Sequence, residues 1–312
     1  MSRILFQSLH NHNYHPRSFK SFTKAMSVST SITPTESRAS ELREALSEVR
    51  SQILESTPPN RTAQPPTLVA VSKYKPASDI LACYQAGQRD FGENYVQELE
   101  KKTKEPELQG DIRWHFIGQI QSKAKNLATI PNLYCVQTVS SEREAKDLQK
   151  HFSKKFATSP SDSDASTSKP RLNVLIQVNT SGEDVKHGLP ALSDYSDATT
   201  SPLLALARYI VEQCDALHLQ GLMTIGSLSE SLSSSSADNV NRDFERLRES
   251  RDVLEGRLKD EGEWGVEGRL VLSMGMSSDF RAAIKAGSDV VRVGTGIFGA
   301  RAKKGEVPPL TS

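Results

Sequence analysis

The chain lacks the features that mark several large classes of protein. It holds only three cysteines in 312 residues, and no two of them form a CxxC pair. We therefore expect neither a zinc site nor a redox pair, and a reducing compartment is favoured. No apolar run reaches about 18 residues, which argues against a transmembrane helix. The net charge is only +1, with 25% charged residues, so neither nucleic acid nor a membrane is an expected partner.

The first 35 residues lack acidic side chains altogether. Their basic residues are Arg3, Arg17, Lys20 and Lys24. This composition is typical of a mitochondrial presequence, and it also fits a disordered tail or translation that begins at Met26. We expect a cytoplasmic or mitochondrial protein and set residues 1–35 apart from the fold, together with a tail at 306–312.

From residue 36 onward, short β-rich apolar runs alternate with amphipathic segments, which predicts parallel strands joined by helices. The predicted strands are Thr67–Lys73, Asp90–Glu93, Arg113–Gly118, Leu133–Val139, Leu172–Asn179, Leu219–Ile225, Arg269–Ser273 and Val290–Val293. The predicted helices are Ala77–Ala86, Tyr95–Lys104, Ser122–Thr129, Glu142–Phe156, Leu203–Ala216, Asn241–Leu258 and Asp279–Ala286, preceded by a capping helix at Glu36–Glu55. Eight such units predict a single closed (β/α)8 TIM-type barrel over residues 36–305.

Three segments rich in Ser, Thr, Asp or Pro interrupt this rhythm, near residues 159–169, 192–201 and 227–239. Because they hold few apolar residues, they cannot bury enough surface to form structure of their own. We interpret them as surface insertions in one barrel. An open doubly wound sheet remains the alternative, although no GxGxxG follows the first strand.

Lys73 is the first candidate for chemistry. It ends a strand whose apolar residues predict burial on both faces, and desolvation lowers the pKa of an amine and makes it a better Schiff-base nucleophile. A lysine that reaches solvent from a strand end is the competing interpretation. In a barrel the βα loops converge on one mouth, where other predicted strands end with Glu93, Asn94, Asn179 and Thr224.

The last two units predict a phosphate site. Ser277 or Ser278 can cap the helix that follows the seventh strand, where unpaired N–H groups favour an anion. The turn Gly294-Thr295-Gly296 adds further N–H groups, and loops after the last two strands commonly hold phosphate in such barrels. Arg292 cannot lose its proton near neutral pH, so it would keep a facing pyridine nitrogen unprotonated. An ion pair of Arg292 with Asp289 or Asp279 is the alternative.

Together these residues resemble a known family. The motifs are Val71-Ser72-Lys73, Phe91-Gly92-Glu93-Asn94-Tyr95, Trp114-His115-Phe116-Ile117-Gly118, Gly221-Leu222-Met223-Thr224, Leu272-Ser273-Met274-Gly275-Met276-Ser277 and Val291-Arg292-Val293-Gly294-Thr295. From about Pro66 to Ala300 the chain resembles the pyridoxal phosphate homeostasis proteins, also called proline synthase co-transcribed homologues.

The resemblance implies a barrel like the N-terminal domain of alanine racemase, with pyridoxal 5'-phosphate (PLP) as cofactor. By it, Lys73 is the Schiff-base lysine and Arg292 faces the pyridine nitrogen. The phosphate is held by Ser277, Gly294 and Thr295. Asn94, His115 and Met223 line the pocket, and Lys186 takes part in cofactor transfer.

The expected function is to store PLP and supply it to PLP-dependent apoenzymes. After Gly299 only a short tail remains, without the domain through which alanine racemases dimerise and supply a second acid or base. We therefore expect a monomer that is not an enzyme. A slow amino-acid racemase is the alternative, followed by a barrel that uses Lys73 with sugar phosphates.

Overall fold

The computed structural model describes residues 32–61, 64–158, 170–183, 186–192, 200–227, 230 and 241–300. Residues 1–31 of the basic leader, the 306–312 tail and most of the three predicted insertions lie outside these described residues. Within the described ranges, no helix combines the length and apolar character needed to cross a membrane.

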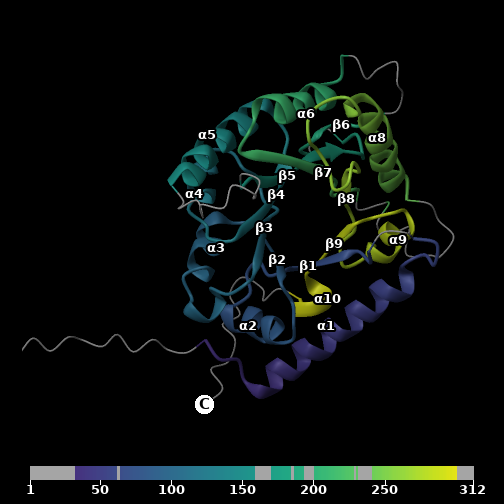
Figure 1. Cartoon of the computed structure of the whole chain (residues 1–312). Coiled ribbons are helices and arrows are strands. Elements are labelled where there is room, and N and C mark those ends of the chain that lie inside the picture. The colour runs from purple at the N-terminus through teal and green to yellow at the C-terminus, as the bar shows by residue number, and fades with distance from the viewer. Residues whose placement is uncertain are drawn as a thin grey trace, which may run out of the picture. The chain divides into compact units, whose positions relative to one another are not determined.

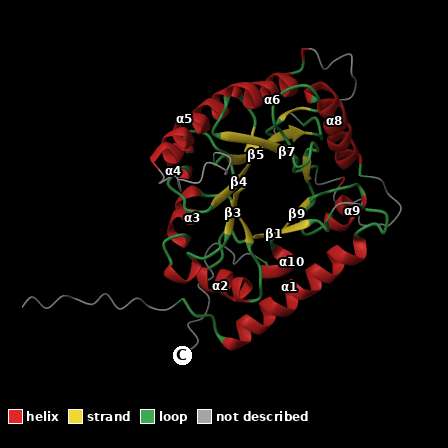
Figure 2. Ribbon diagram, viewed as in Figure 1, coloured by secondary structure: helices red, strands yellow, loops and turns green. Residues whose placement is uncertain are grey.

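Nine strands of the described chain form one sheet, and every pairing is parallel. Their order is β4-β3-β2-β1-β9-β8-β7-β5-β6, and a further pairing of β4 with β5 closes the sheet. Eight strands therefore surround the axis in Figure 2, and the two-residue β6 is added beside β5. The strands are β1 (Thr67–Val71), β2 (Asp90–Glu93), β3 (Arg113–Phe116), β4 (Leu133–Val139), β5 (Leu172–Asn179), β6 (Leu189–Pro190), β7 (Leu217–Met223), β8 (Val271–Ser273) and β9 (Val290–Val293).

The predicted (β/α)8 barrel is confirmed, and the open sheet is wrong because β4 also pairs with β5, which closes the ring of strands. β2, β4, β5 and β9 have the predicted bounds. β1 ends at Val71, two residues before the predicted end. The reason is a turn in which Tyr74 adopts a φ of 62° and the N–H of Lys75 donates to the carbonyl of Ser72 at 3.0 Å.

Helices surround the barrel (Figure 1) because each crossover between parallel strands packs one apolar face against the sheet. They are α1 (Glu36–Ser56), α2 (Ala77–Gln85), α3 (Val96–Lys102), α4 (Ala124–Leu127), α5 (Glu142–Thr158), α6 (Pro202–Gln213), α8 (Arg242–Leu258), α9 (Phe280–Lys285) and α10 (Thr295–Phe298), with a 3-10 turn η1 at Pro106–Leu108. The predicted helices all form, and their bounds agree with the prediction to within three residues at each end.

α1 lies in the helical ring between α2 and α9 (Figure 1), contacts both of them, and covers the four-residue α10. Thr35 caps it by accepting the N–H of Arg38 at 3.3 Å. The Arg38 guanidinium donates to Asp79 at 2.7 Å, at the start of α2, and to the carbonyl of Phe298 at 3.0 Å. This single side chain therefore joins α1 to α2 and to the end of the barrel.

The barrel has two buried regions, one between the strands and the helices and one enclosed by the strands. Between strands and helices lies a large apolar core that includes Phe91 and Trp114, whose ring centroids are 5.9 Å apart. Burying each such ring contributes about 1.5–3 kcal/mol. Inside the strands, a small apolar cluster of Cys135, Leu175 and Met223 is surrounded by buried polar side chains. A polar axis within an apolar shell is the feature that positions the candidate site.

Candidate functional site

Lys73 stands at the carboxyl end of β1. The N–H of Ser72 still donates to Gly92 on β2 at 3.0 Å, and the Ser72 hydroxyl points behind the sheet to Glu93 at 2.6 Å. Lys73 itself lies in the turn that follows β1, and its side chain is half-buried. The residue therefore stands at the end of the barrel where the βα loops converge, and its bond to a cofactor stays a prediction.

The loops after β8 and β9 meet at Ser277. Its hydroxyl oxygen accepts the backbone N–H of Gly294 at 3.1 Å and that of Gly296 at 3.5 Å. A Cβ on Gly294 would lie 3.3 Å from the carbonyl oxygen of Val71, so the turn runs against the end of β1. Thr295, between the two glycines, is exposed at the start of α10. The structure brings these residues together within reach of the strand that leads to Lys73.

Ser277 does not cap a helix, contrary to the sequence-based interpretation. α9 begins at Phe280 with Asp279 in the capping position, and the Asp279 carboxylate instead accepts the N–H of Met276 at 2.6 Å. The tight loop depends on Gly275, where φ is 92° and an added Cβ would lie 2.5 Å from the Cβ of Ala283. The Ser277 hydroxyl lies before this capping position and faces the glycine turn.

Arg292 is a buried cation inside the barrel, 4% exposed. Nη1 donates to the Ser273 hydroxyl at 2.7 Å, and Nη2 donates to the carbonyl of Thr224 at 2.7 Å. Burial lowers the pKa of Arg292 to about 10, although the charge of Asp279 opposes the shift, so the guanidinium stays charged at neutral pH. The alternative ion pair with Asp289 is wrong, because Asp289 binds Arg61 at 2.6 Å.

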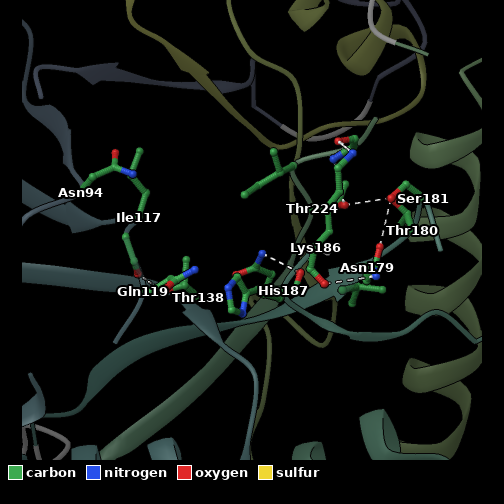
Figure 3. Close-up of a pocket in the computed structure, with 15 residues that line it drawn as sticks. Asn94, Ile117, Gln119, Thr138, Asn179, Thr180, Ser181, Lys186, His187 and Thr224 are labelled. Atoms are coloured by element: carbon green, nitrogen blue, oxygen red, sulfur yellow. Dashed lines mark hydrogen bonds between the residues drawn. The ribbon is translucent and has the colours of Figure 1, made fainter. Parts of the chain in front are cut away.

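A cavity of about 270 Å³ opens at the mouth on the side of β2 to β7 (Figure 3). Asn94, Asn179 and Thr224 line it, as their positions at strand ends predict. The side-chain oxygen of Asn94 is buried and has no hydrogen-bond partner among the described residues. The cavity therefore offers an acceptor that a polar ligand would satisfy.

Lys186 lies on the loop between β5 and β6 and also lines this cavity (Figure 3). Its ammonium donates to the carbonyl of Gly226 at 2.7 Å and pairs with Glu183 at 2.9 Å. These contacts join the loop after β5 to the loop after β7. The predicted role of Lys186 in transfer is not decided by this geometry, but its place at the mouth fits that role.

His115 lies elsewhere than predicted. Nε2 is 3.0 Å from the carboxylate of Asp90 at the start of β2, and Nδ1 is 3.0 Å from the amide nitrogen of Gln137. The ring lines a second cavity, of about 740 Å³, at the amino ends of the strands. The bond to Asp90 draws His115 away from the mouth, so its predicted place against the cofactor is corrected. Met223 is buried within the barrel beside Cys135 and Leu175, and its contact with a cofactor stays a prediction.

Glu93, another strand-end residue, faces away from the mouth. It is fully buried and pairs at 2.6 Å with Lys102 of α3. Burial raises the pKa of Glu93, while Lys102 and the hydroxyl of Ser72 oppose the shift. Lys102 also donates to the carbonyl of Ser72 at 2.8 Å. This pair fixes α3 and the segment that precedes Lys73, and it is structural.

Sequence reasoning missed Gln137 as a functional residue. It lies in β4 with 1% of its surface exposed and connects His115 to Ser273. A signal was present in the strand alternation, because Cys135 and Gln137 share one face of β4 and an amide on an inward face requires partners. Nothing in the sequence identified those partners.

Comparison with known proteins agrees with this geometry. Residues 59–302 match the family model described as alanine racemase, N-terminal domain. The pyridoxal phosphate homeostasis protein of Homo sapiens is 39% identical over 261 residues, which cover 82% of this chain and 84% of that protein. The protein of the same name from Schizosaccharomyces pombe is 41% identical over 263 residues, covering 84% of this chain and 94% of that one.

Among solved structures, PipY of Synechococcus elongatus with PLP bound superposes with a TM-score of 0.58 at 28% identity. The match covers 83% of this chain and 100% of PipY. On the strength of the family model and of relatives 39% and 41% identical over most of both chains, this chain belongs to the pyridoxal phosphate homeostasis protein family, on an alanine racemase-type barrel.

Proposed function

We propose that this chain binds pyridoxal 5'-phosphate at the mouth of the barrel and serves intracellular PLP homeostasis by holding the cofactor and supplying it to PLP-dependent apoenzymes. One observation carries the proposal: Ser277, Gly294 and Gly296 converge on a single point beside the end of β1. The relatives are named for PLP homeostasis, and the PipY structure contains PLP.

The chain's residues fit the phosphate of PLP. A phosphate accepts hydrogen bonds, and the N–H groups of Gly294 and Gly296 are donors that now share one hydroxyl oxygen. The Ser277 hydroxyl is itself a donor as well as an acceptor. Because a side chain on Gly294 would crowd Val71, the turn keeps its backbone open to a bulky anion.

Lys73 supplies the covalent link as a Schiff base. Its Nζ condenses with the aldehyde carbon of the cofactor, which forms one C=N bond and releases one water, so no oxidant or co-reactant is needed. When bound, PLP supplies an electron-accepting ring and a reactive aldehyde. By holding that aldehyde, Lys73 limits its reaction with other amines.

Arg292 favours storage over catalysis. A guanidinium that faces the pyridine nitrogen leaves that nitrogen unprotonated, and an unprotonated ring is a weaker electron sink. Arg292 is held in the barrel by Ser273 and by the carbonyl of Thr224, with further N–H groups of its fork directed elsewhere. The weaker electron sink damps carbanion chemistry, which favours a carrier over a racemase.

The experiment that tests the proposal is an absorbance spectrum of the purified protein with PLP, before and after borohydride reduction, followed by peptide mapping. We expect a band that reduction removes and a pyridoxyl group on Lys73. Lys73→Ala should abolish this adduct and leave the fold intact, whereas Lys186→Ala should retain it. Absence of the band with excess PLP would refute the proposal, and an adduct on Lys186 would refute the role of Lys73.

Delivery and catalysis need a separate measurement. The PLP-loaded protein is mixed with a PLP-dependent apoenzyme in the presence of a scavenger of free aldehyde, and the recovery of apoenzyme activity is followed. A carrier should restore activity where the same concentration of free PLP does not. Turnover of an amino acid by the loaded protein alone would favour the racemase alternative.

The proposal extends to location. The basic leader would direct the chain to mitochondria, or a start at Met26 would leave it in the cytoplasm. If the leader is a presequence, a fluorescent fusion of the full chain should localise to mitochondria and a fusion that begins at Met26 should stay in the cytoplasm. Identical cytoplasmic patterns would remove the mitochondrial alternative.

A further inference from the structure

A row of side-chain hydrogen bonds runs through the barrel from Arg292 to the opposite end. The Arg292 guanidinium donates to Ser273 at 2.7 Å, and the Ser273 hydroxyl donates to the amide oxygen of Gln137 at 2.7 Å. The amide nitrogen of Gln137 is 3.0 Å from Nδ1 of His115, and Nε2 of His115 is 3.0 Å from the carboxylate of Asp90. Four bonds thus connect β9, β8, β4, β3 and β2.

The chemistry of the two ends gives every bond in this row the same direction. Arg292 can only donate, and the ionised carboxylate of Asp90 can only accept. His115 therefore carries a proton on Nε2, and in a neutral imidazole Nδ1 is then left to accept from Gln137. If the Gln137 amide were reversed, its NH2 group would face the Ser273 hydroxyl, which already accepts from Arg292. Its carbonyl oxygen would then face Nδ1 of His115, so that two acceptors would meet. Only one arrangement with a neutral imidazole satisfies all of the groups.

Little of the row's surface is exposed. Ser273 is fully buried, Gln137 is 1% exposed and His115 is 3% exposed, although Gln137 and His115 border the cavity of about 740 Å³. Because a buried polar group that loses its partner costs free energy, each member holds its neighbours in place. The outer end is anchored where Nε of Arg113 donates to Asp90 at 2.7 Å, beside the cavity of about 740 Å³.

We propose that Gln137 and His115 are positioning residues that hold the Arg292 guanidinium in its orientation toward the ligand, although neither lies at the mouth. Asp90, which Arg113 holds at the amino ends of the strands, orients His115, and His115, Gln137 and Ser273 in turn orient Arg292. The inference rests on the proposed function only in that the ligand facing Arg292 is PLP. Breaking the row at Gln137 releases Ser273, and with it one of the two acceptors of Arg292.

The first test needs no cofactor. In the apoprotein with ¹⁵N-labelled arginine, NMR measures how fast the Arg292 guanidinium rotates and how fast its Nη protons exchange, with the signals assigned by Arg292→Lys. Gln137→Met preserves shape and removes both hydrogen bonds. We expect it to accelerate rotation by about tenfold, because Ser273 is no longer held in place as an acceptor of Arg292. Gln149→Met is the control, since Gln149 of α5 is half-buried and bonds Ser153 and the N–H of Ala216, which lie outside the row.

The second test uses the PLP-loaded protein. Gln137→Met should shift the absorbance maximum of the bound cofactor and weaken its binding by about tenfold, and Gln149→Met should do neither. Ser273→Ala should act in the same way, with Ser288→Ala as its control, because both serines are fully buried. The double variant Gln137→Met with Ser273→Ala should bind PLP no more weakly than whichever single variant binds it less tightly, because both substitutions break the same row.

Each outcome decides one claim. Unchanged Arg292 rotation in folded Gln137→Met overturns the positioning role, whether or not PLP binds. If that variant does not fold, His115→Phe breaks the next bond and must accelerate the rotation. Additive effects of Gln137→Met and Ser273→Ala would also overturn the row. Failure of the wild-type protein to bind PLP would instead refute the proposed function, and the apoprotein measurement would still stand.

Discussion

Ser277 and Gly294 are 17 residues apart in the chain, and the hydroxyl oxygen of Ser277 accepts the N–H of Gly294 at 3.1 Å. The contact joins the loop after β8 to the turn after β9. It leaves a hydroxyl and two backbone N–H groups pointing at one place, which is the arrangement that a phosphate requires. Much of the affinity for PLP should reside here.

Ser277→Ala should therefore weaken PLP binding by about tenfold to a hundredfold, since a hydrogen bond to a charged group contributes roughly 1.5–3 kcal/mol. Stability should change little, because the two N–H groups lie at an accessible turn. Spectrophotometric titration with PLP gives the affinity. Ser278→Ala is the control, since Ser278 is the adjacent and exposed serine. Equal affinities for the two variants would contradict a phosphate site at Ser277.

The ion pair of Glu93 with Lys102 supports a second prediction. Both side chains are buried, at 0% and 6% exposure, so Lys102→Met would leave a carboxylate uncompensated. We expect a loss of about 3 kcal/mol in the free energy of unfolding, as is typical when one partner of a buried pair is removed. Urea denaturation measures it. Lys101→Met, at an exposed neighbouring position, should be nearly neutral, and a small loss for both would show that the pair is dispensable.

The alternation of apolar runs and amphipathic segments was enough to predict the barrel, because each strand is continuous in sequence and each crossover helix follows directly. The residues of the mouth could be predicted for the same reason, since strand ends converge. His115 could not be placed, because its position depends on Asp90, which lies 25 residues earlier. Likewise, Ser277 looks like a helix cap until Asp279 is seen to occupy that position.

Lys186 gives a prediction about kinetics. Its ammonium joins the loop after β5 to the carbonyl of Gly226 on the loop after β7, beside the mouth cavity. Lys186→Met removes this bond and the pair with Glu183. We expect PLP to leave the protein several-fold faster, as for the loss of about one hydrogen bond to a charged group. Stopped-flow transfer to a scavenger measures the rate. Lys285→Met, on α9 away from this cavity, should keep the wild-type rate, and an unchanged rate in Lys186→Met would remove the loop contact from the path of release.

Asp90 predicts a dependence of stability on pH. Burial alone would raise its pKa, but hydrogen bonds from Arg113 and His115 outweigh burial and lower the pKa below its ordinary value. A carboxylate with a depressed pKa in the folded state stabilises the fold above its ordinary pKa of about 4 and loses that contribution as the pH falls through the folded value. Asp90→Asn should accordingly be less stable than the wild type by about 1–3 kcal/mol near pH 7, and the difference should shrink below about pH 4.

Urea denaturation of both proteins at pH 7 and at a pH below the ordinary pKa of aspartate, about 4, checks the sign. Asp111→Asn is the matched control, because Asp111 also pairs with an arginine but is 69% exposed, where solvent screens the pair. Its stability should follow that of the wild type at both pH values. A difference between the wild type and Asp90→Asn that grew on acidification would mean that the carboxylate is held protonated. In that case His115 would lose the acceptor that fixes its proton on Nε2, and the orientation of Gln137 could no longer follow from Asp90.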